Sequence, residues 1–215
     1  MTFASRKEAG ARLGRELAAR NIQADVILGL PRGGVVVAAE IARILKRPLG
    51  VLVVRKIGHP RFREFAVGAL AEAETVVLDE AAIEKTRVEP DELKEIILEE
   101  TDRLKRHVGK FECGPRPGFA GQSLVLADDG LATGATTEAA VRSARKQGAM
   151  RITVAVPVAS SSGYARLAGV SDEVIALLID PNFQAVGQYY LSFSQTTDEE
   201  VISLLEGASR NTGRS

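Results

Sequence analysis

The sequence is short of the residues that mark several protein classes. Among its 215 residues there is one cysteine, Cys113, no tryptophan, and only 5% aromatic residues. A lone cysteine excludes an internal disulfide and fits a reducing compartment. The 28 basic residues balance the 28 acidic ones, so no net charge draws the chain to nucleic acid or to a membrane. Any anion-binding site must therefore be local.

Long apolar runs and secretion signals are also missing. No stretch reaches the roughly 20 apolar residues that a membrane-spanning helix needs. Residues 1–7 lead into an amphipathic pattern rather than the apolar core of a signal peptide. There is no Walker A lysine motif, no GxGxxG after a strand, and no Cys/His cluster with metal-ligand spacing. We expect a soluble, cytoplasmic protein, and 215 residues suit a single domain.

Short apolar runs alternate with amphipathic segments along the chain. This alternation predicts an α/β fold in which helices flank a central, mostly parallel sheet. Two neighbouring runs, residues 66–71 and 75–78, predict a β-hairpin. The other predicted strands are 25–30, 49–54, 123–127, 151–158 and 172–179, and the predicted helices are 5–20, 35–45, 90–108, 138–145 and 197–205.

The most informative stretch begins with the predicted strand at 123–127. An acid pair, Asp128 and Asp129, follows the strand, and a threonine loop then leads into a helix. Backbone N–H groups and the dipole at a helix start attract phosphate, while two carboxylates accept hydrogen bonds from vicinal sugar hydroxyls. The pattern predicts a phosphosugar site; the alternative is a generic strand–turn–helix with surface aspartates. The threonine loop consists of Ala132, Thr133, Gly134, Ala135, Thr136 and Thr137.

The order of strand, acid pair, threonine loop and helix resembles the ribose-phosphate signature of the type I phosphoribosyltransferases. The resemblance implies that fold, with a core at about 5–179, a small C-terminal hood largely at 180–196, and a closing helix at 197–206. It also implies that the acid pair holds the ribose and that the threonine loop binds the 5′-phosphate. One departure is Gly130, because an apolar residue commonly stands there and the entry geometry of the loop is left open.

A second turn, Pro31-Arg32-Gly33-Gly34, follows the predicted strand at 25–30. Two glycines after an arginine allow backbone amides to approach an anion closely, and the helix start behind them adds to the field. In the resemblance this Arg-Gly-Gly turn is the pyrophosphate loop, and the family parallel places a cis peptide bond before Arg32. The alternative is an ordinary strand–helix turn whose glycines serve close packing.

Basic residues follow the predicted strand at 49–54. The resemblance implies that Arg55 and Lys56 contact pyrophosphate, although a solvated charge pair is the alternative. It further implies that residues 57–65 form a mobile loop that closes over the site and excludes water. The candidate residues of that loop are His59, Arg61 and Arg63.

The two histidines and the cysteine are weaker candidates for a functional role. His59 is either a general base or a solvated loop histidine beside Pro60, and His107 is placed on the solvated face of the helix at 90–108. The stretch that begins with Cys113-Gly114-Pro115-Arg116 is too short for a thiolate phosphatase loop.

Aromatic residues are scarce, yet they cluster near the C-terminus. In the family, a hood stacks an aromatic ring on the acceptor base, so Phe183, Tyr189 and Tyr190 are candidates for base binding. The alternative is that these rings pack the hood onto the core or form the contact of a homodimer.

The resemblance implies transfer of a phosphoribosyl group from phosphoribosyl pyrophosphate (PRPP) to a nitrogen acceptor, with a nucleobase as the first candidate. The resemblance also implies that Mg²⁺ is coordinated by the pyrophosphate and the sugar hydroxyls, and that Asp128 and Asp129 hold the ion indirectly. Two clues to the identity of the base conflict. Position 132 holds alanine, where the 6-oxopurine enzymes of the family commonly have an aspartate, and in this the chain resembles adenine-type enzymes. The Arg-Gly-Gly turn instead resembles that of the xanthine-guanine branch. We therefore name no base.

Two alternatives to this enzyme belong to other classes. One is a non-catalytic, PRPP- or nucleotide-binding regulatory protein; the sequence has no added helix-turn-helix region and no basic stripe, which favours the enzyme. The other is a phosphosugar-binding or hydrolytic enzyme on a similar sheet, for which the sequence provides no evident acid–base pair elsewhere.

Overall fold

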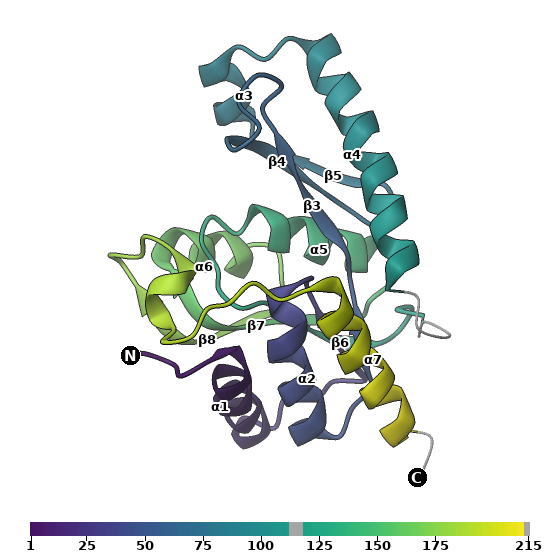
Figure 1. Cartoon of the computed structure of the whole chain (residues 1–215), viewed down its shortest axis with the longest axis vertical. Helices are drawn as coiled ribbons and strands as arrows, with labels where there is room; N and C mark the ends of the chain where they lie inside the picture. The colour runs from purple at the N-terminus through teal and green to yellow at the C-terminus, as the bar shows by residue number, and fades with distance from the viewer. Residues whose placement is uncertain (112–117, 213–215) are drawn as a thin grey trace.

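The computed structural model describes residues 1–111 and 118–212, so Cys113 and its neighbours up to Pro117 lie outside the described residues. Figure 1 shows a main body built around one sheet and a smaller unit that projects from it. In chain order the elements are α1 (Arg6–Ala19), β1 (Val26–Gly29), α2 (Gly33–Leu45), β2 (Leu49–Val51), β3 (Val54–Gly58), β4 (Ala66–Ala71), β5 (Thr75–Leu78), α3 (Glu80–Thr86), α4 (Pro90–Lys110), β6 (Ser123–Ala127), α5 (Ala135–Lys146), β7 (Arg151–Ser160), α6 (Ser161–Ala168), β8 (Glu173–Asp180), the 3₁₀ turn η1 (Val186–Tyr189) and α7 (Asp198–Thr212).

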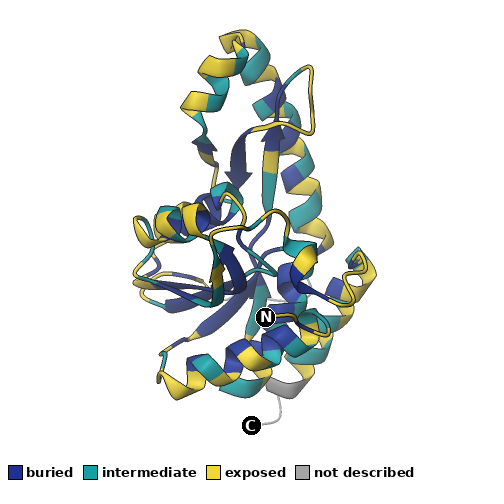
Figure 2. Cartoon of the chain, turned by 90° about the vertical axis from the view of Figure 1, so that its left-hand side faces the viewer, coloured by how far each residue is buried: buried dark blue, intermediate teal, exposed yellow. Residues whose placement is uncertain are grey.

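The main sheet has the order β2-β1-β6-β7-β8, and every neighbouring pair in it is parallel. Because side chains alternate between the faces of a strand, Leu28 packs on the α5 side while Ile27 packs against α1 and α2. Helices therefore cover both faces, which explains why β6 is buried throughout. Figure 2 shows the buried, dark blue ribbon inside the main body and the exposed, yellow segments toward its outside. The predicted α/β fold with a parallel sheet flanked by helices is confirmed.

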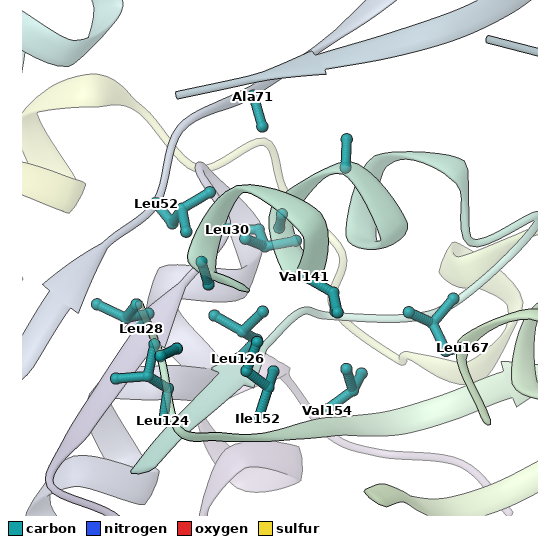
Figure 3. Close-up of a cluster of buried hydrophobic side chains, with 14 of the residues drawn as sticks. Leu28, Leu30, Leu52, Ala71, Leu124, Leu126, Val141, Ile152, Val154 and Leu167 are labelled. Atoms are coloured by element: carbon teal, nitrogen blue, oxygen red, sulfur yellow. The ribbon is translucent and has the colours of Figure 1, made fainter. Parts of the chain in front are cut away.

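The projecting unit is a three-stranded antiparallel sheet, β3-β4-β5, packed against α4. Helix α5 lies between the two sheets. Figure 3 shows Leu126 and Val154 of the parallel sheet on one side of the helix and Ala71 of β4 on the other. The hairpin predicted at 66–71 and 75–78 is confirmed as β4 and β5.

The single strand predicted at 49–54 is wrong. The chain leaves the parallel sheet after Val51 and enters the antiparallel sheet at Val54, so two strands replace one. The second of these, β3, continues to Gly58, and residues 57 and 58 are therefore strand rather than loop. Ile57 is fully buried against α4, which explains why pairing persists there.

Helices α3 and α6 are not predicted by the sequence patterns. Both begin at a side-chain cap: Asp79 accepts a hydrogen bond from the N–H of Ala82, and Ser160 accepts one from the N–H of Gly163. The hydroxyl-rich start of α6 and its short length hide the apolar periodicity.

The N-terminal segment is tied to the hood. The N–H of Phe3 donates to the carbonyl of Tyr189, and the N–H of Leu191 donates to the carbonyl of Phe3, both at 2.8 Å. The ring of Phe3 is fully buried, and Tyr189 and Tyr190 belong to the same cluster. The start of α1 is thereby placed beside the C-terminal segment. Across the two described ranges, no helix combines the length and the apolar character needed to cross a membrane.

Candidate functional site

The Arg-Gly-Gly turn and the acid pair meet at the carboxyl edge of the parallel sheet. They follow β1 and β6, which are direct neighbours. A Cβ atom on Gly33 would lie 2.1 Å from Oδ2 of Asp129, and one on Gly34 would lie 2.7 Å from the carbonyl oxygen of Ala127. Only glycine permits such an approach. Two segments that are distant in sequence are thus brought into contact, at the edge where open parallel sheets bind ligands.

The two helices that start at this edge lack side-chain caps. Helix α2 begins after Arg32 and α5 after Gly134, and neither has a hydrogen bond from a capping side chain. Helices α1, α3 and α6 are capped by Ser5, Asp79 and Ser160, whereas α4 also begins without a side-chain cap, away from this edge. The first turns of α2 and α5 therefore lack a capping side chain, an arrangement that suits an anion as the acceptor of their N–H groups.

The threonine loop is held in place by β7 and α6. The N–H of Leu131 donates to Val158, the N–H of Ser160 donates back to Leu131, and the hydroxyl of Ser160 donates to the carbonyl of Ala132 at 2.5 Å. Gly134 adopts a left-handed φ of 78° before the helix. Thr137 is buried, and its hydroxyl has no hydrogen-bond partner among the described residues. Hydrogen bonds from Ser160 and to Val158 thus support the entry to the loop.

The departure at Gly130 has a packing reason. A Cβ atom there would lie 2.6 Å from Cγ1 of Val186, in the 3₁₀ turn of the hood. An apolar side chain at this position would collide with the hood, so in this chain the glycine and Val186 fill the space together.

The two carboxylates of the acid pair have different surroundings. Oδ1 of Asp128 accepts the N–H of Asp129 at 2.8 Å, and Oδ2 of Asp129 accepts Nε of Arg6 at 2.7 Å. Burial, and then the charge of Asp129, raise the pKa of Asp128 well above its usual range, while the cations Arg6 and Lys56 oppose this rise. Asp128 therefore resists ionisation, whereas Asp129 is paired.

Arg6 is a site residue that the sequence analysis missed. It lies in the first turn of an amphipathic helix, where a charged side chain is ordinarily solvated. Tyr190 was predicted for another role: its hydroxyl donates to the carbonyl of Asp129 at 2.6 Å. Burial, and then the charge of Asp129, raise the pKa of Tyr190, so this hydroxyl stays a donor. Both terminal segments thus hold the acid pair.

The cis peptide bond predicted before Arg32 is confirmed. The guanidinium of Arg32 lies 3.7 Å from Oδ1 of Asp198, at the start of α7, and Oδ2 of Asp198 accepts Nζ of Lys110 at 2.9 Å. Asp198 was not singled out in the sequence because its pattern is that of an ordinary first-turn acid of the closing helix. It is the carboxylate next to the Arg-Gly-Gly turn.

The two basic residues of β3 separate. Nε of Arg55 donates to Oε2 of Glu100 at 2.6 Å, and Glu100 is buried in α4. Lys56 is exposed, and its charge acts on Asp128. Arg55 and Lys56 therefore do not form a solvated charge pair, because Arg55 is bonded to a buried carboxylate. The prediction for His107 is wrong as well: it is half-buried with Nδ1 3.4 Å from Arg55, and burial, followed by the charge of Arg55, lowers its pKa.

The loop between β3 and β4 lies against α4. His59 is buried rather than solvated, because its Nδ1 accepts the N–H groups of Arg61 and Phe62. The guanidinium groups of Arg61 and Arg63 pair with α4 carboxylates, at 3.1 Å from Glu92 and at 2.9 Å from Glu99 respectively. His59 shapes this turn. Movement of the loop over the site stays a prediction.

The hood aromatics divide into packed rings and one half-buried ring. Tyr189 and Tyr190 are 5% and 7% exposed, and the hydroxyl of Tyr189 donates to Oδ2 of Asp180 at 2.8 Å. Both tyrosines therefore pack the C-terminal segment onto the core, which is the alternative to base binding. Phe183 is half-buried and stacks on Tyr189 with ring centroids 5.4 Å apart. Of the three predicted rings, Phe183 is the one with surface left for a base.

The acid pair suits a hard cation only in part. Carboxylate oxygens are ligands that Mg²⁺ prefers, but one oxygen of Asp129 is already bonded to Arg6. In the part of the chain that the structure describes, no group of three or more His, Cys, Asp or Glu side chains could hold a metal. Among the described residues, the acid pair could therefore supply only part of the ligands of a magnesium ion.

Comparisons with known proteins find a family model and several relatives that are similar to this chain. A family model described as "Phosphoribosyl transferase domain" matches residues 5–193. "Putative phosphoribosyl transferase Rv0571c" of Mycobacterium tuberculosis is 41% identical over 210 residues, which are 97% of this chain and 47% of that protein. The chain thus spans about half the length of the curated relatives it matches.

Two solved structures are similar in fold. The crystal structure of TT1426 from Thermus thermophilus is 42% identical, with a TM-score of 0.81 over 96% of this chain and 99% of that chain. The purine phosphoribosyltransferase from Pyrococcus horikoshii is 17% identical, with a TM-score of 0.51 over 92% of this chain and 95% of that chain. The second likeness concerns the fold alone.

Proposed function

We propose, because the chain belongs to the phosphoribosyl transferase domain family, that it transfers a phosphoribosyl group from PRPP to a nitrogen acceptor and releases pyrophosphate. One observation carries the proposal: two uncapped helix starts flank the acid pair at the same edge of the sheet. PRPP carries a phosphate and a pyrophosphate on either side of a ribose, which matches that order of anion site, carboxylates and anion site.

Each part of the site takes one part of the donor. The N–H groups of α5 and the hydroxyls of the threonine loop bind the 5′-phosphate. Asp128 and Asp129 accept the vicinal hydroxyls of the ribose, and the Arg-Gly-Gly turn with Arg32 and Lys56 binds the pyrophosphate. Bound Mg²⁺ would neutralise part of the pyrophosphate charge, with the acid pair holding it through water or the sugar.

Catalysis in this arrangement is positioning and charge stabilisation. The bond from the anomeric carbon to the pyrophosphate oxygen breaks while the acceptor nitrogen forms a bond to the same carbon and gives up its proton to the leaving pyrophosphate or to water. The helix starts and Arg32 stabilise the charge that grows on the leaving pyrophosphate. Closure of residues 59–65 over the sugar would exclude water from the electron-poor carbon.

The acceptor is a small nitrogen compound, with a nucleobase as the first candidate. Position 132 has no carboxylate to handle a base proton, and its carbonyl is already taken by Ser160. Recognition of the base is left to the hood, where Phe183 offers a half-buried ring. These features fit a place in nucleotide metabolism without selecting one base.

The test is release of pyrophosphate from PRPP and Mg²⁺ with a panel of purine and pyrimidine bases. We expect turnover with at least one base. Tight binding of PRPP without turnover of any base would overturn the enzyme and leave the regulatory protein. Failure to bind PRPP would overturn both.

Asp198 offers a prediction on the pyrophosphate side of the site. Its carboxylate lies 3.7 Å from the guanidinium of Arg32 and so lowers the local positive potential. Replacing it in Asp198→Asn is expected to tighten binding of pyrophosphate by about three- to tenfold, equivalent to about 1 kcal/mol. Isothermal titration with pyrophosphate and Mg²⁺ measures the change.

The control for this prediction is Glu16→Gln, which removes one negative charge from an exposed pair with Arg20 on α1. It is expected to leave pyrophosphate binding unchanged. Weaker binding in Asp198→Asn would contradict the prediction and would mean that Asp198 holds Arg32 in its binding position.

A further inference from the structure

The last turn of α4 reaches the main body beside the first turn of α7 (Figure 1). There Nζ of Lys110 donates to Oδ2 of Asp198 at 2.9 Å, while the guanidinium of Arg32 lies 3.7 Å from Oδ1 of the same carboxylate. The charges of these three residues also act on His107, which lies about one turn earlier on α4. One carboxylate therefore lies between two cations, one from the Arg-Gly-Gly turn and one from α4.

The two cations keep a surplus of positive charge and of hydrogen-bond donors. Lys110 and Arg32 share Asp198, and neither has another ion pair with a described residue. Oδ1 of Asp198 is buried and accepts no hydrogen bond from the described residues, so the donors of Arg32 are not engaged there. The ammonium of Lys110 uses one of its three N–H groups on Oδ2. Since the side chains of Arg32 and Lys110 are 38% and 55% exposed, an anion can reach both from solvent.

The two cations also continue the order of the proposed site. Gly33 adjoins the acid pair, because a Cβ atom there would lie 2.1 Å from Oδ2 of Asp129. The side chain of Arg32 instead extends to Asp198, and so toward α7 and the end of α4. A pyrophosphate that begins at the ribose and passes the glycines therefore has its outer phosphate, the one farther from the ribose, nearest to Arg32 and Lys110.

We propose that Lys110 is a further pyrophosphate-binding residue, which bonds the outer phosphate together with Arg32 and so favours a diphosphate donor over a monophosphate. The inference rests on the proposed function, because it extends the pyrophosphate end of the same site. A lysine suits this position, since its compact charge on a flexible stem can turn from a carboxylate to a phosphate oxygen. Asp198 keeps the two cations close together and also opposes the phosphate through its own charge.

The test is isothermal titration of the wild type, Lys110→Gln and Lys110→Arg with pyrophosphate and Mg²⁺, and separately with ribose 5-phosphate. Lys110→Gln is expected to bind pyrophosphate about tenfold more weakly, because it loses a charge-assisted hydrogen bond. Lys110→Arg keeps the charge and should keep most of the affinity. Binding of ribose 5-phosphate should stay unchanged, because this compound has no pyrophosphate. The matched control is Lys105→Gln, which removes an exposed lysine from the same helix and is expected to bind pyrophosphate like the wild type.

The Asp198→Asn background separates binding from a structural role. If Lys110 served only to hold α4 to α7 through Asp198, its replacement would cost little once that carboxylate is gone. If Lys110 binds the phosphate, Lys110→Gln is expected to weaken pyrophosphate binding by about tenfold in this background as well. Two results would overturn the proposal: Lys110→Gln binds pyrophosphate like the wild type, or its loss of affinity disappears in the Asp198→Asn background.

Failure of this proposal can be told from failure of the proposed function. If the wild type binds pyrophosphate and Lys110→Gln binds it equally well, only the role of Lys110 is overturned. If the wild type binds neither pyrophosphate nor PRPP, the proposed function is overturned, and the role of Lys110 with it.

Discussion

The double variant Asp128→Asn with Asp129→Asn is expected to lose PRPP affinity by about 100-fold or more while it remains folded. Each carboxylate that accepts a sugar hydroxyl contributes a charge-assisted hydrogen bond, worth about 1.5–3 kcal/mol, and the two losses fall on vicinal hydroxyls of the same ring. The amide NH₂ groups are donors, so they cannot replace both acceptors. Isothermal titration with PRPP and Mg²⁺ measures the loss.

The folded state is expected to survive because the amide oxygen of each asparagine can still accept the hydrogen bond that the aspartate accepts, from the N–H of residue 129 or from Nε of Arg6. In Asp128→Asn the new amide oxygen can still accept the N–H of residue 129, as Oδ1 of Asp128 does at 2.8 Å. Burial and the charge of Asp129 raise the pKa of Asp128, so its ionisation destabilises the folded state at neutral pH. Asp128→Asn alone is therefore expected to raise the unfolding midpoint near pH 7.

The sign of this effect can be checked with pH. The folded-state pKa of Asp128 lies above the unfolded value, so the cost of its charge is absent below about pH 4 and grows as the pH rises. The stability gain of Asp128→Asn should follow the same course in urea unfolding. A gain that shrinks as the pH rises would show that the carboxylate is not destabilised by its surroundings.

The control for binding is Asp79→Asn, at the cap of α3. Asparagine caps a helix as well as aspartate does, so this variant is expected to keep both stability and PRPP affinity. If the double variant of the acid pair also kept its PRPP affinity, the assignment of these carboxylates to the ribose would be refuted.

The parts of the site that could be predicted are contiguous in sequence. The acid pair and the Arg-Gly-Gly turn each follow an apolar strand and precede a helix, so local pattern indicates their chemistry. Their meeting was also predictable, because the carboxyl ends of parallel strands share one edge. The hydrogen bond from Arg6 to Asp129 spans 123 residues, and nothing in the spacing of α1 distinguishes Arg6 from its solvated neighbours.

Burial was the property that local pattern misjudged. His59, beside a proline, has the pattern of a solvated loop residue, yet it is 4% exposed and organises its turn through two backbone N–H groups. Residues 49–54 predict one strand because the run is rich in valine and leucine, yet the chain changes sheets at Leu52 and Val53, both fully buried. In each case the tertiary neighbours decide, and they come from distant parts of the chain.

The variant Gly163→Ala is expected to weaken PRPP binding by about tenfold or more, although residue 163 contacts no proposed ligand. A Cβ atom there would lie 2.3 Å from the carbonyl oxygen of Ala132 and 3.1 Å from Cγ of Leu131. The nearer atom belongs to the backbone of the threonine loop, so relief requires the loop to shift. We expect a stability cost of about 1–3 kcal/mol from this overpacking, offset in part because alanine favours a helix more than glycine does.

Gly169→Ala is the matched control, since it adds the same methyl group at the other end of α6. The nearest atom to its Cβ would be 3.5 Å away, and its φ of −81° suits alanine. It is expected to keep PRPP affinity. Comparison of both affinities with both unfolding midpoints separates a shift of the loop from general destabilisation. Equal affinities in the two variants would mean that α6 does not set the position of the loop.

The variant Ser160→Ala tests the same connection between α6 and the threonine loop without adding a methyl group to a packed site. The hydroxyl of Ser160 caps α6 at the N–H of Gly163 and donates to the carbonyl of Ala132 at 2.5 Å, so one oxygen connects the helix to the loop. Its removal is expected to weaken PRPP binding less than Gly163→Ala does, because the loop is released rather than pushed. If both variants act through the same loop, the double variant should bind PRPP about as weakly as Gly163→Ala alone, instead of showing the sum of the two losses.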